Sequence, residues 1–108
     1  MGSLSYNHKT FDFDDRILTH LQIVIVRKLR RGESFLVSWK HTAQMGGGRS
    51  SIWVHPSVPL LFTFAGGRSP TVNLVWLAQL SLSADGPHGL VVTGEDLAHG
   101  SGLPAQGR

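Results

Sequence analysis

The spacing of apolar residues changes along the chain, and the longest regular stretch lies between Asp14 and Gly32. Apolar residues there recur at intervals of one, three and four, which is typical of a helix with one buried face. Asp14 or Asp15 caps its start, where a carboxylate favours the positive end of the helix. A basic run followed by Gly32 marks its end. The predicted buried face consists of Ile17, Leu18, Leu21, Val24, Ile25 and Leu29.

Apolar and polar residues alternate on both sides of this helix, and a period of two indicates strands. Residues 4–13 predict a first hairpin. Residues 35–40 and 50–55 predict a second, antiparallel hairpin with a long glycine-rich tip. After two prolines, residues 60–64 alternate again and predict a third strand of the same meander.

A second helix is predicted to begin at Ser69, because a capping Ser precedes a Pro at the first helical position. It runs to about Ala84 and is expected to bury Val72, Trp76, Leu77 and Leu80. Residues 90–92 predict a short last strand.

The order strand, strand, helix, three strands, helix, strand predicts an α+β fold. We expect an antiparallel sheet of about five to six strands with two helices packed on one face. Residues 1–93 are predicted to form a single α+β domain. Residues 94–108, rich in glycine and poor in apolar side chains, are predicted to form a flexible tail.

Composition narrows the class of protein. A hydrophobic content of 41% with 16% charged residues is ordinary for a globular domain. The chain has no cysteine, which excludes disulfides, thiolate metal sites and a cysteine nucleophile and fits a cytoplasmic location. No apolar run reaches the roughly 18–20 residues that a membrane span needs, and the N-terminus lacks a signal-peptide pattern.

Positive charge gathers at the end of the first predicted helix, where four basic residues exceed the whole net charge of +3. With a fifth residue from the glycine-rich tip, they form a candidate patch for anions or nucleic acid. The patch consists of Arg27, Lys28, Arg30, Arg31 and Arg49. Basic residues also complement the negative end of a helix, and the sequence favours this structural interpretation.

The outer face of the predicted sheet is the other candidate surface. If His41 pairs with Ser50, Ser38 faces Trp53 and Leu36 faces His55 on the side away from the helices. An exposed Trp among aliphatic residues indicates an interface, unless the first hairpin or the chain terminus covers it. The candidate interface consists of Leu36, Ser38, Lys40, Trp53, His55 and Leu61.

The residues give little support for a phosphate-binding loop, a metal site or a catalytic serine. Gly46, Gly47 and Gly48 join two predicted strands and no Lys follows, so they match a hairpin tip better than a phosphate-binding loop. The six histidines lack the spacing of a metal site, and no serine lies in a nucleophile elbow. We expect no cofactor, no metal and no enzymatic activity.

Three segments, DDRILTHLQIVIVRKLRRGESF, SIWVHPSVPLLFTF and VWLAQL followed by GLVV, resemble a family of short uncharacterised actinobacterial proteins. Members of this family often carry the label "ATP-dependent DNA ligase". The resemblance covers roughly residues 2–93 and implies no catalytic residues. Ligase activity needs a lysine in a K-x-D-G motif to attack the nucleotide's α-phosphate, and no lysine here has that context. The sequence therefore argues against autonomous ligase activity.

Two functional hypotheses remain. The first is a small non-catalytic binding module that contacts a protein partner, or a second copy, through the outer sheet face. The alternative is an accessory protein that binds nucleic acid with the basic helix end, in a DNA-repair context that only the ligase label suggests. Neither hypothesis involves a membrane.

Overall fold

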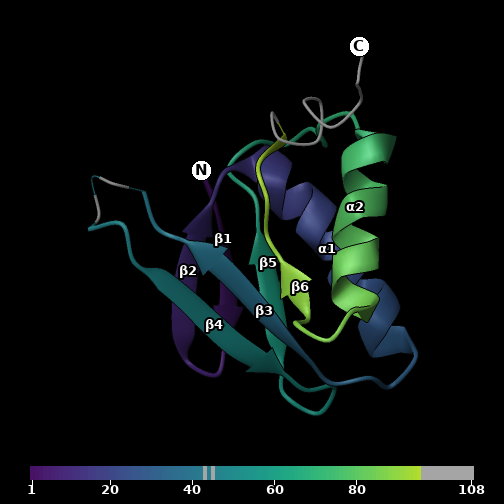
Figure 1. The fold of residues 1–108 in the computed structure, drawn as a ribbon. Helices are drawn as coiled ribbons and strands as arrows, with labels where there is room; N and C mark the ends of the chain where they lie inside the picture. Colours follow the sequence, from purple (N-terminus) through teal and green to yellow (C-terminus); the bar gives the residue numbers. More distant parts are fainter. Residues whose placement is uncertain (43, 45, 96–108) are drawn as a thin grey trace. The chain divides into compact units, whose positions relative to one another are not determined.

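The computed structural model describes residues 1–42, 44 and 46–95, and it confirms the α+β class and the predicted order of elements (Figure 1). The strands form two sheets of three strands each instead of the single sheet predicted. These sheets belong to two compact units of the chain. The predicted tail from residue 96 onward lies outside the described residues, and the prediction of a single domain stays a prediction.

The first unit comprises Met1–Ser34 and Val54–Val72. Its N-terminal hairpin, predicted from the alternating pattern, consists of β1 (Gly2–Tyr6) and β2 (Lys9–Phe13). The turn residues Asn7 and His8 both have positive φ, 52° and 69°, as a two-residue hairpin turn requires.

Helix α1 (Asp15–Arg30) contacts β1, and its bounds agree with the prediction. Asp14 is the cap, because its carboxylate accepts the backbone N–H of Arg16 at 3.1 Å. The helix buries a stripe formed by Leu18, Leu21, Val24 and Ile25, together with Thr19, His20 and Lys28. His20 is fully buried and donates from Nδ1 to the Arg16 carbonyl at 2.7 Å.

Strand β5 (Leu60–Thr63) pairs with β1, with Phe62 opposite Leu4. The predicted meander, in which this strand continues from the preceding hairpin, is therefore wrong. The segment between Val54 and Leu60 turns, with the Val58 N–H donating to the His55 carbonyl at 3.1 Å. Two prolines in this segment remove backbone donors, so the chain leaves one sheet before it enters the other.

The second unit comprises Phe35–Trp53 and the described residues from Asn73 onward. Strand β3 (Phe35–Lys40) lies at the centre of its sheet, between β4 (Arg49–Val54) and β6 (Leu90–Val91). Strand β6 runs parallel to β3, with Leu90 opposite Val37, so the prediction of an all-antiparallel sheet is wrong. A parallel neighbour needs a crossover connection, and helix α2 (Leu74–Asp85) provides it.

Helix α2 contacts β3 and β6 and begins later than predicted (Figure 1). Asn73 is its cap and accepts the Trp76 N–H at 3.1 Å, so the predicted start at Ser69 is wrong. The carbonyl of Thr71 instead accepts a hydrogen bond from Arg16 at 2.6 Å, which holds this segment in the first unit. The helix buries Trp76, Leu77, Leu80 and Ala84.

Neither of the two helices in the described part of the chain has the length and apolar character needed to span a membrane.

Candidate protein-binding surface

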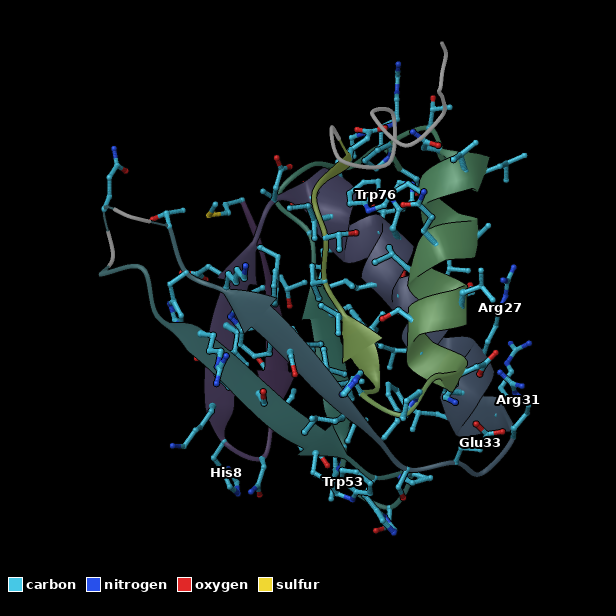
Figure 2. All side chains as sticks on the ribbon, viewed as in Figure 1. His8, Arg27, Arg31, Glu33, Trp53 and Trp76 are labelled. Atoms are coloured by element: carbon cyan, nitrogen blue, oxygen red, sulfur yellow. The ribbon has the colours of Figure 1, made fainter. Side chains whose placement is uncertain are left out.

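One face of the sheet in the second unit carries an exposed tryptophan. Phe35 and Val37 of β3 are buried, whereas the alternate residues of this strand are partly or fully exposed. Trp53 lies near the carboxyl end of β4 and is 59% exposed (Figure 2). The alternation predicted from the sequence is therefore present on β3, and the Trp side chain is accessible.

The pairing of β3 with β4 differs from the predicted register. The backbone N–H of His41 donates to the carbonyl of Gly48 at 2.6 Å, so Gly48 and not Ser50 lies opposite His41. The hydroxyl hydrogen bond between Ser38 and Ser51, 2.8 Å long, follows the same register. Because the shift is two residues, each side chain stays on its predicted face while its partner changes.

This register forms three cross-strand pairs on the exposed face. Leu36 lies opposite Trp53, Ser38 opposite Ser51, and Lys40 opposite Arg49. Opposed side chains in such pairs have Cβ atoms about 4.5–5.5 Å apart, so each pair forms one contact area.

The parallel strand β6 adds an apolar residue to the same face. Val91 lies beside Ser38 and is 39% exposed. The sequence analysis missed this residue because the run GLVV contains no signal that specifies its neighbour. We call the resulting face the Trp53 surface; it consists of Leu36, Ser38, Lys40, Arg49, Ser51, Trp53 and Val91.

The Trp53 surface changes in chemical character along its length. The Leu36–Trp53 end is apolar, the central hydroxyls of Ser38 and Ser51 bond to each other, and the Lys40–Arg49 end carries two cations. A complementary partner therefore offers an apolar side chain at one end and carboxylates at the other. Arg49, which the sequence analysis assigned to the nucleic-acid patch, lies on this surface.

Two predicted members of the interface lie in the first unit and on different secondary structure. His55 follows β4, and its Nδ1 bonds to the hydroxyl of Ser57 at 2.7 Å and accepts the Ser57 N–H at 3.1 Å. The backbone N–H of His55 donates to the Tyr6 hydroxyl at 2.9 Å. Leu61 is 60% exposed on β5, beside Ser5 of β1. The predicted six-residue interface is therefore not a single sheet face.

The structure also forms two serine–histidine contacts that the sequence did not reveal. Besides the His55–Ser57 pair, His41 Nε2 bonds to Ser50 Oγ at 2.7 Å. A nucleophilic serine needs a base that a third group orients, and the Nδ1 of His55 is already shared with a backbone N–H. We interpret both contacts as structural. Within the described ranges, no group of three or more His, Cys, Asp or Glu residues is arranged to hold a metal ion.

The basic helix end is smaller than predicted. Lys28 is only 7% exposed, and its Nζ lies 2.6 Å from the carboxylate of Glu33. Arg31 Nε lies 3.7 Å from the same carboxylate. The side chains of Arg31 and Glu33 are labelled in Figure 2. Arg27 and Arg30 are exposed with Arg31 at this end of α1. Lys28 is therefore a buried residue whose charge is paired with Glu33. The accessible basic cluster at this end of α1 consists of Arg27, Arg30 and Arg31.

The glycine-rich tip between β3 and β4 is a hairpin connection, as predicted. Gly46 and Gly47 have positive φ, 98° and 70°. The N–H of Gly47 donates to the carbonyl of Thr42 at 3.0 Å, so this amide is used within the tip itself. A phosphate-binding loop instead directs such amides toward the ligand.

A family model described as "Domain of unknown function (DUF7882)" matches residues 1–95. The chain belongs to the DUF7882 family. The DUF7882 match includes each helix and strand of residues 1–95, and with them the whole Trp53 surface. No curated protein and no solved structure matched the chain.

Proposed function

We propose that this DUF7882 chain is a small non-catalytic binding domain that contacts a protein through the Trp53 surface. The observation that supports the proposal is the 59% exposure of Trp53 on a regular sheet, opposite Leu36. Tryptophan is enriched among the residues that dominate binding energy at protein interfaces. A rigid strand also presents its side chain with little loss of conformational entropy on binding.

The charge of the surface narrows the class of partner. Lys40 and Arg49 lie at the end of the surface away from Trp53 and favour a partner segment with Asp or Glu at that position. The partner is another protein or a second copy of the chain, and either contributes an apolar side chain opposite Trp53.

Affinity capture with the wild-type chain, followed by a binding titration with the recovered protein, tests the proposal. We expect Trp53→Ser to weaken binding by about 30-fold or more, as for a central aromatic residue of an interface. A Lys40→Glu/Arg49→Glu variant should slow association and reduce its salt dependence. Sedimentation of the chain alone shows whether the partner is a second copy.

Leu61→Ser is the matched control, because Leu61 is equally exposed but lies on the other sheet. It should change the affinity by no more than about twofold, since exposed residues outside an interface contribute little. The proposal would be contradicted if Trp53→Ser weakened neither binding to the recovered protein nor self-association of the chain.

A second candidate function rests on the exposed cluster Arg27, Arg30 and Arg31 and on the ligase label of the resembling family. Nucleic-acid binding by this cluster should fall steeply with salt, because each phosphate contact releases counterions. Fluorescence anisotropy with labelled DNA and RNA at two salt concentrations measures this. Binding that Arg30→Glu/Arg31→Glu abolishes and Trp53→Ser leaves intact would favour this second function over the first.

The proposed lack of catalysis has its own test. Ligase-type chemistry transfers adenylate from ATP to a lysine amine. Incubation of the chain with ATP labelled at the α-phosphate should leave no label on the denatured protein. A covalent label would contradict the proposal.

A further inference from the structure

Strand β4 forms one edge of the sheet in the second unit (Figure 1). Strand β3 lies on one side of it, and no strand in the described part of the chain pairs with its other side. An edge strand presents unpaired backbone N–H and C=O groups, which another extended segment matches. The backbone of β4 therefore offers hydrogen bonds in addition to the side chains of the Trp53 surface.

The hydrogen bonds of β3 show which backbone groups of β4 face outward. The carbonyl of Ser38 accepts the N–H of Val92 at 2.9 Å, so the backbone groups of Ser38 are directed toward the side of β6. Ser38 and Ser51 therefore form a pair without backbone hydrogen bonds between them, and the N–H and C=O of Ser51 point away from β3. Because this direction alternates along a strand, the backbone groups of Arg49 and Trp53 also face the open edge.

These three residues are the ones that β4 contributes to the Trp53 surface. Arg49, Ser51 and Trp53 are exposed, whereas Ser50 and Ile52 between them are half-buried. Among the described residues, none forms a hydrogen bond with the outer side of β4. A segment that pairs with this edge would place alternate side chains on the Trp53 surface at the same time, because opposed residues of paired strands point to the same face.

Strand β4 also lacks the features that protect an edge strand. Proline, charged side chains and bulges hinder pairing with another chain. Strand β2, an edge of the other sheet, carries two charged residues, Lys9 and Asp12, among its five. Residues 50–54 of β4, with the sequence SSIWV, contain no proline, no glycine and no charge. This edge is therefore suited to pairing.

The side chains at the start of β4 favour an acidic segment. Lys40 and Arg49 lie opposite each other, and directly opposed like charges are destabilising. No carboxylate of the described residues forms an ion pair with either of them. A carboxylate opposite Arg49 on an added strand would offset this repulsion, and an apolar side chain opposite Trp53 would cover the indole ring.

We infer that the partner segment of the Trp53 surface is an extended peptide that adds to the open edge of β4 as an antiparallel strand, the more stable of the two pairings. An apolar residue of the peptide lies opposite Trp53, and an Asp or Glu four residues later lies opposite Arg49. The residue midway between them exchanges both backbone hydrogen bonds with Ser51. This inference rests on the proposed function and adds the conformation, direction and sequence pattern of the partner.

Substitution of Ser51 separates the backbone of the edge from its side chains. Ser51→Pro removes the outward N–H and keeps the hydrogen bonds to β3, since proline is accommodated in an edge strand where its nitrogen faces solvent. Ser51→Ala is the matched control, because it loses the same hydroxyl, which bonds to Ser38, but retains the N–H. Circular dichroism shows whether both variants are folded.

The probe is a synthetic peptide with the core Leu-Val-Thr-Thr-Glu, titrated into the isotope-labelled full chain and followed by NMR. Ser51→Pro should raise the dissociation constant at least about tenfold relative to Ser51→Ala, because main-chain hydrogen bonds supply the affinity of an added strand. Hydrogen exchange of the Arg49, Ser51 and Trp53 amides in the wild-type chain should slow when the peptide binds.

Two altered peptides test the inference on the wild-type chain, so the result does not depend on the folding of Ser51→Pro. Methylation of the backbone nitrogen at the central Thr removes the donor that faces the Ser51 carbonyl and should weaken binding at least about tenfold. The reversed core, Glu-Thr-Thr-Val-Leu, should bind at least about tenfold more weakly, since an antiparallel strand then places Glu opposite Trp53 and Leu opposite Arg49.

Four outcomes would overturn the inference: no binding of the peptide to the wild-type chain up to about 1 mM, equal affinities of Ser51→Pro and Ser51→Ala, no effect of N-methylation, or equal binding of the reversed core. Protection of the same amides without peptide, in a concentration-dependent dimer, would also overturn it by assigning the edge to a second copy. If Trp53→Ser weakens binding of the protein recovered by affinity capture but Ser51→Pro does not, strand addition is wrong and the proposed function stands. If Trp53→Ser leaves that binding unchanged, the proposed function itself fails.

Discussion

The carboxylate of Asp15, at the first residue of α1, accepts the backbone N–H of Gly66 at 2.9 Å. Its other oxygen accepts the N–H of Ala65 at 3.1 Å. A Cβ added to Gly2 would lie 2.7 Å from the same carboxylate, so the start of β1 passes too close for a side chain. Asp15 therefore ties the start of α1 to the segment that follows β5. The hydrogen bonds from Gly66 and Ala65 lower the pKa of the Asp15 carboxyl below its ordinary value of 3.8.

Asp15→Asn is expected to reduce stability in a pH-dependent way. A folded pKa below the unfolded value means that the carboxylate stabilises the fold above the unfolded pKa, and that this contribution is lost as the pH falls through the folded pKa. The variant should therefore melt at a lower temperature than the wild type at pH 7, and the difference should shrink as the pH falls through the folded pKa of Asp15. Thermal unfolding by circular dichroism measures both.

Asp12→Asn is the control for this pH series, because Asp12 is an exposed residue of β2. Its melting temperature should follow that of the wild type at neutral pH. An Asp15→Asn difference that stays constant from pH 7 to acid pH would show that the charge of Asp15 is not the cause.

Gly89 is predicted to tolerate no side chain. Its φ is +74°, and an added Cβ would overlap the carbonyl of Leu36. Gly89→Ala should therefore destabilise the chain by about 2 kcal/mol or more, combining backbone strain with the close approach of β3. Urea denaturation measures this. Gly67→Ala, with no atom within 4 Å of the added Cβ, should be close to neutral, and equal losses at both positions would contradict the explanation.

The contact between Lys28 and Glu33 predicts an asymmetric response to substitution. Glu33→Gln leaves the largely buried ammonium without its carboxylate and should cost about 1–3 kcal/mol. Lys28→Met removes the buried charge itself and should stay within about 1 kcal/mol of the wild type, since an apolar side chain of similar volume replaces it. Chemical denaturation of both variants is the measurement. A larger loss for Lys28→Met than for Glu33→Gln would contradict the role assigned to Glu33.

Trp76 and Trp53, two of the three tryptophans of the second unit, should respond differently to substitution. Trp76 is 1% exposed and its Nε1 donates to the Thr93 carbonyl at 3.0 Å, so Trp76→Ala should cost about 3–5 kcal/mol. Trp53→Ala should cost less than about 1 kcal/mol, because Trp53 packs little within the chain. Denaturation curves measure both losses of unfolding free energy. If Trp76→Ala does not fold, the milder Trp76→Phe variant replaces it. Similar losses at both positions would argue that Trp53 serves the fold and not a binding surface.

Local pattern was sufficient for the parts of the fold in which neighbouring residues determine the outcome. The spacing of Leu18, Leu21 and Ile25 predicted α1, and the alternation of residues 4–13 predicted the first hairpin. The second helix was also expected, but its start was misplaced because Thr71 is bound by a distant arginine. Helix and hairpin signals are local, whereas the competition for Thr71 is not.

The Trp53 surface was likewise predicted in part from local pattern and decided in part by contacts between distant segments. Alternation placed Leu36, Ser38 and Trp53 on one face, and an error of two residues in register could not move them, because the strand period is two. Their partners depended on the register, which a backbone hydrogen bond between His41 and Gly48 sets. The addition of Val91 depended on a parallel pairing through α2.

The sequence by itself therefore determined the class of fold, the order of its elements and the face on which each strand residue lies. Tertiary structure decided which strands pair, that Lys28 is neutralised by Glu33, and that Leu36 lies opposite Trp53. The physical reason is that periodicity reports which side of an element is buried, while hydrogen bonds between distant segments select the neighbour that buries it.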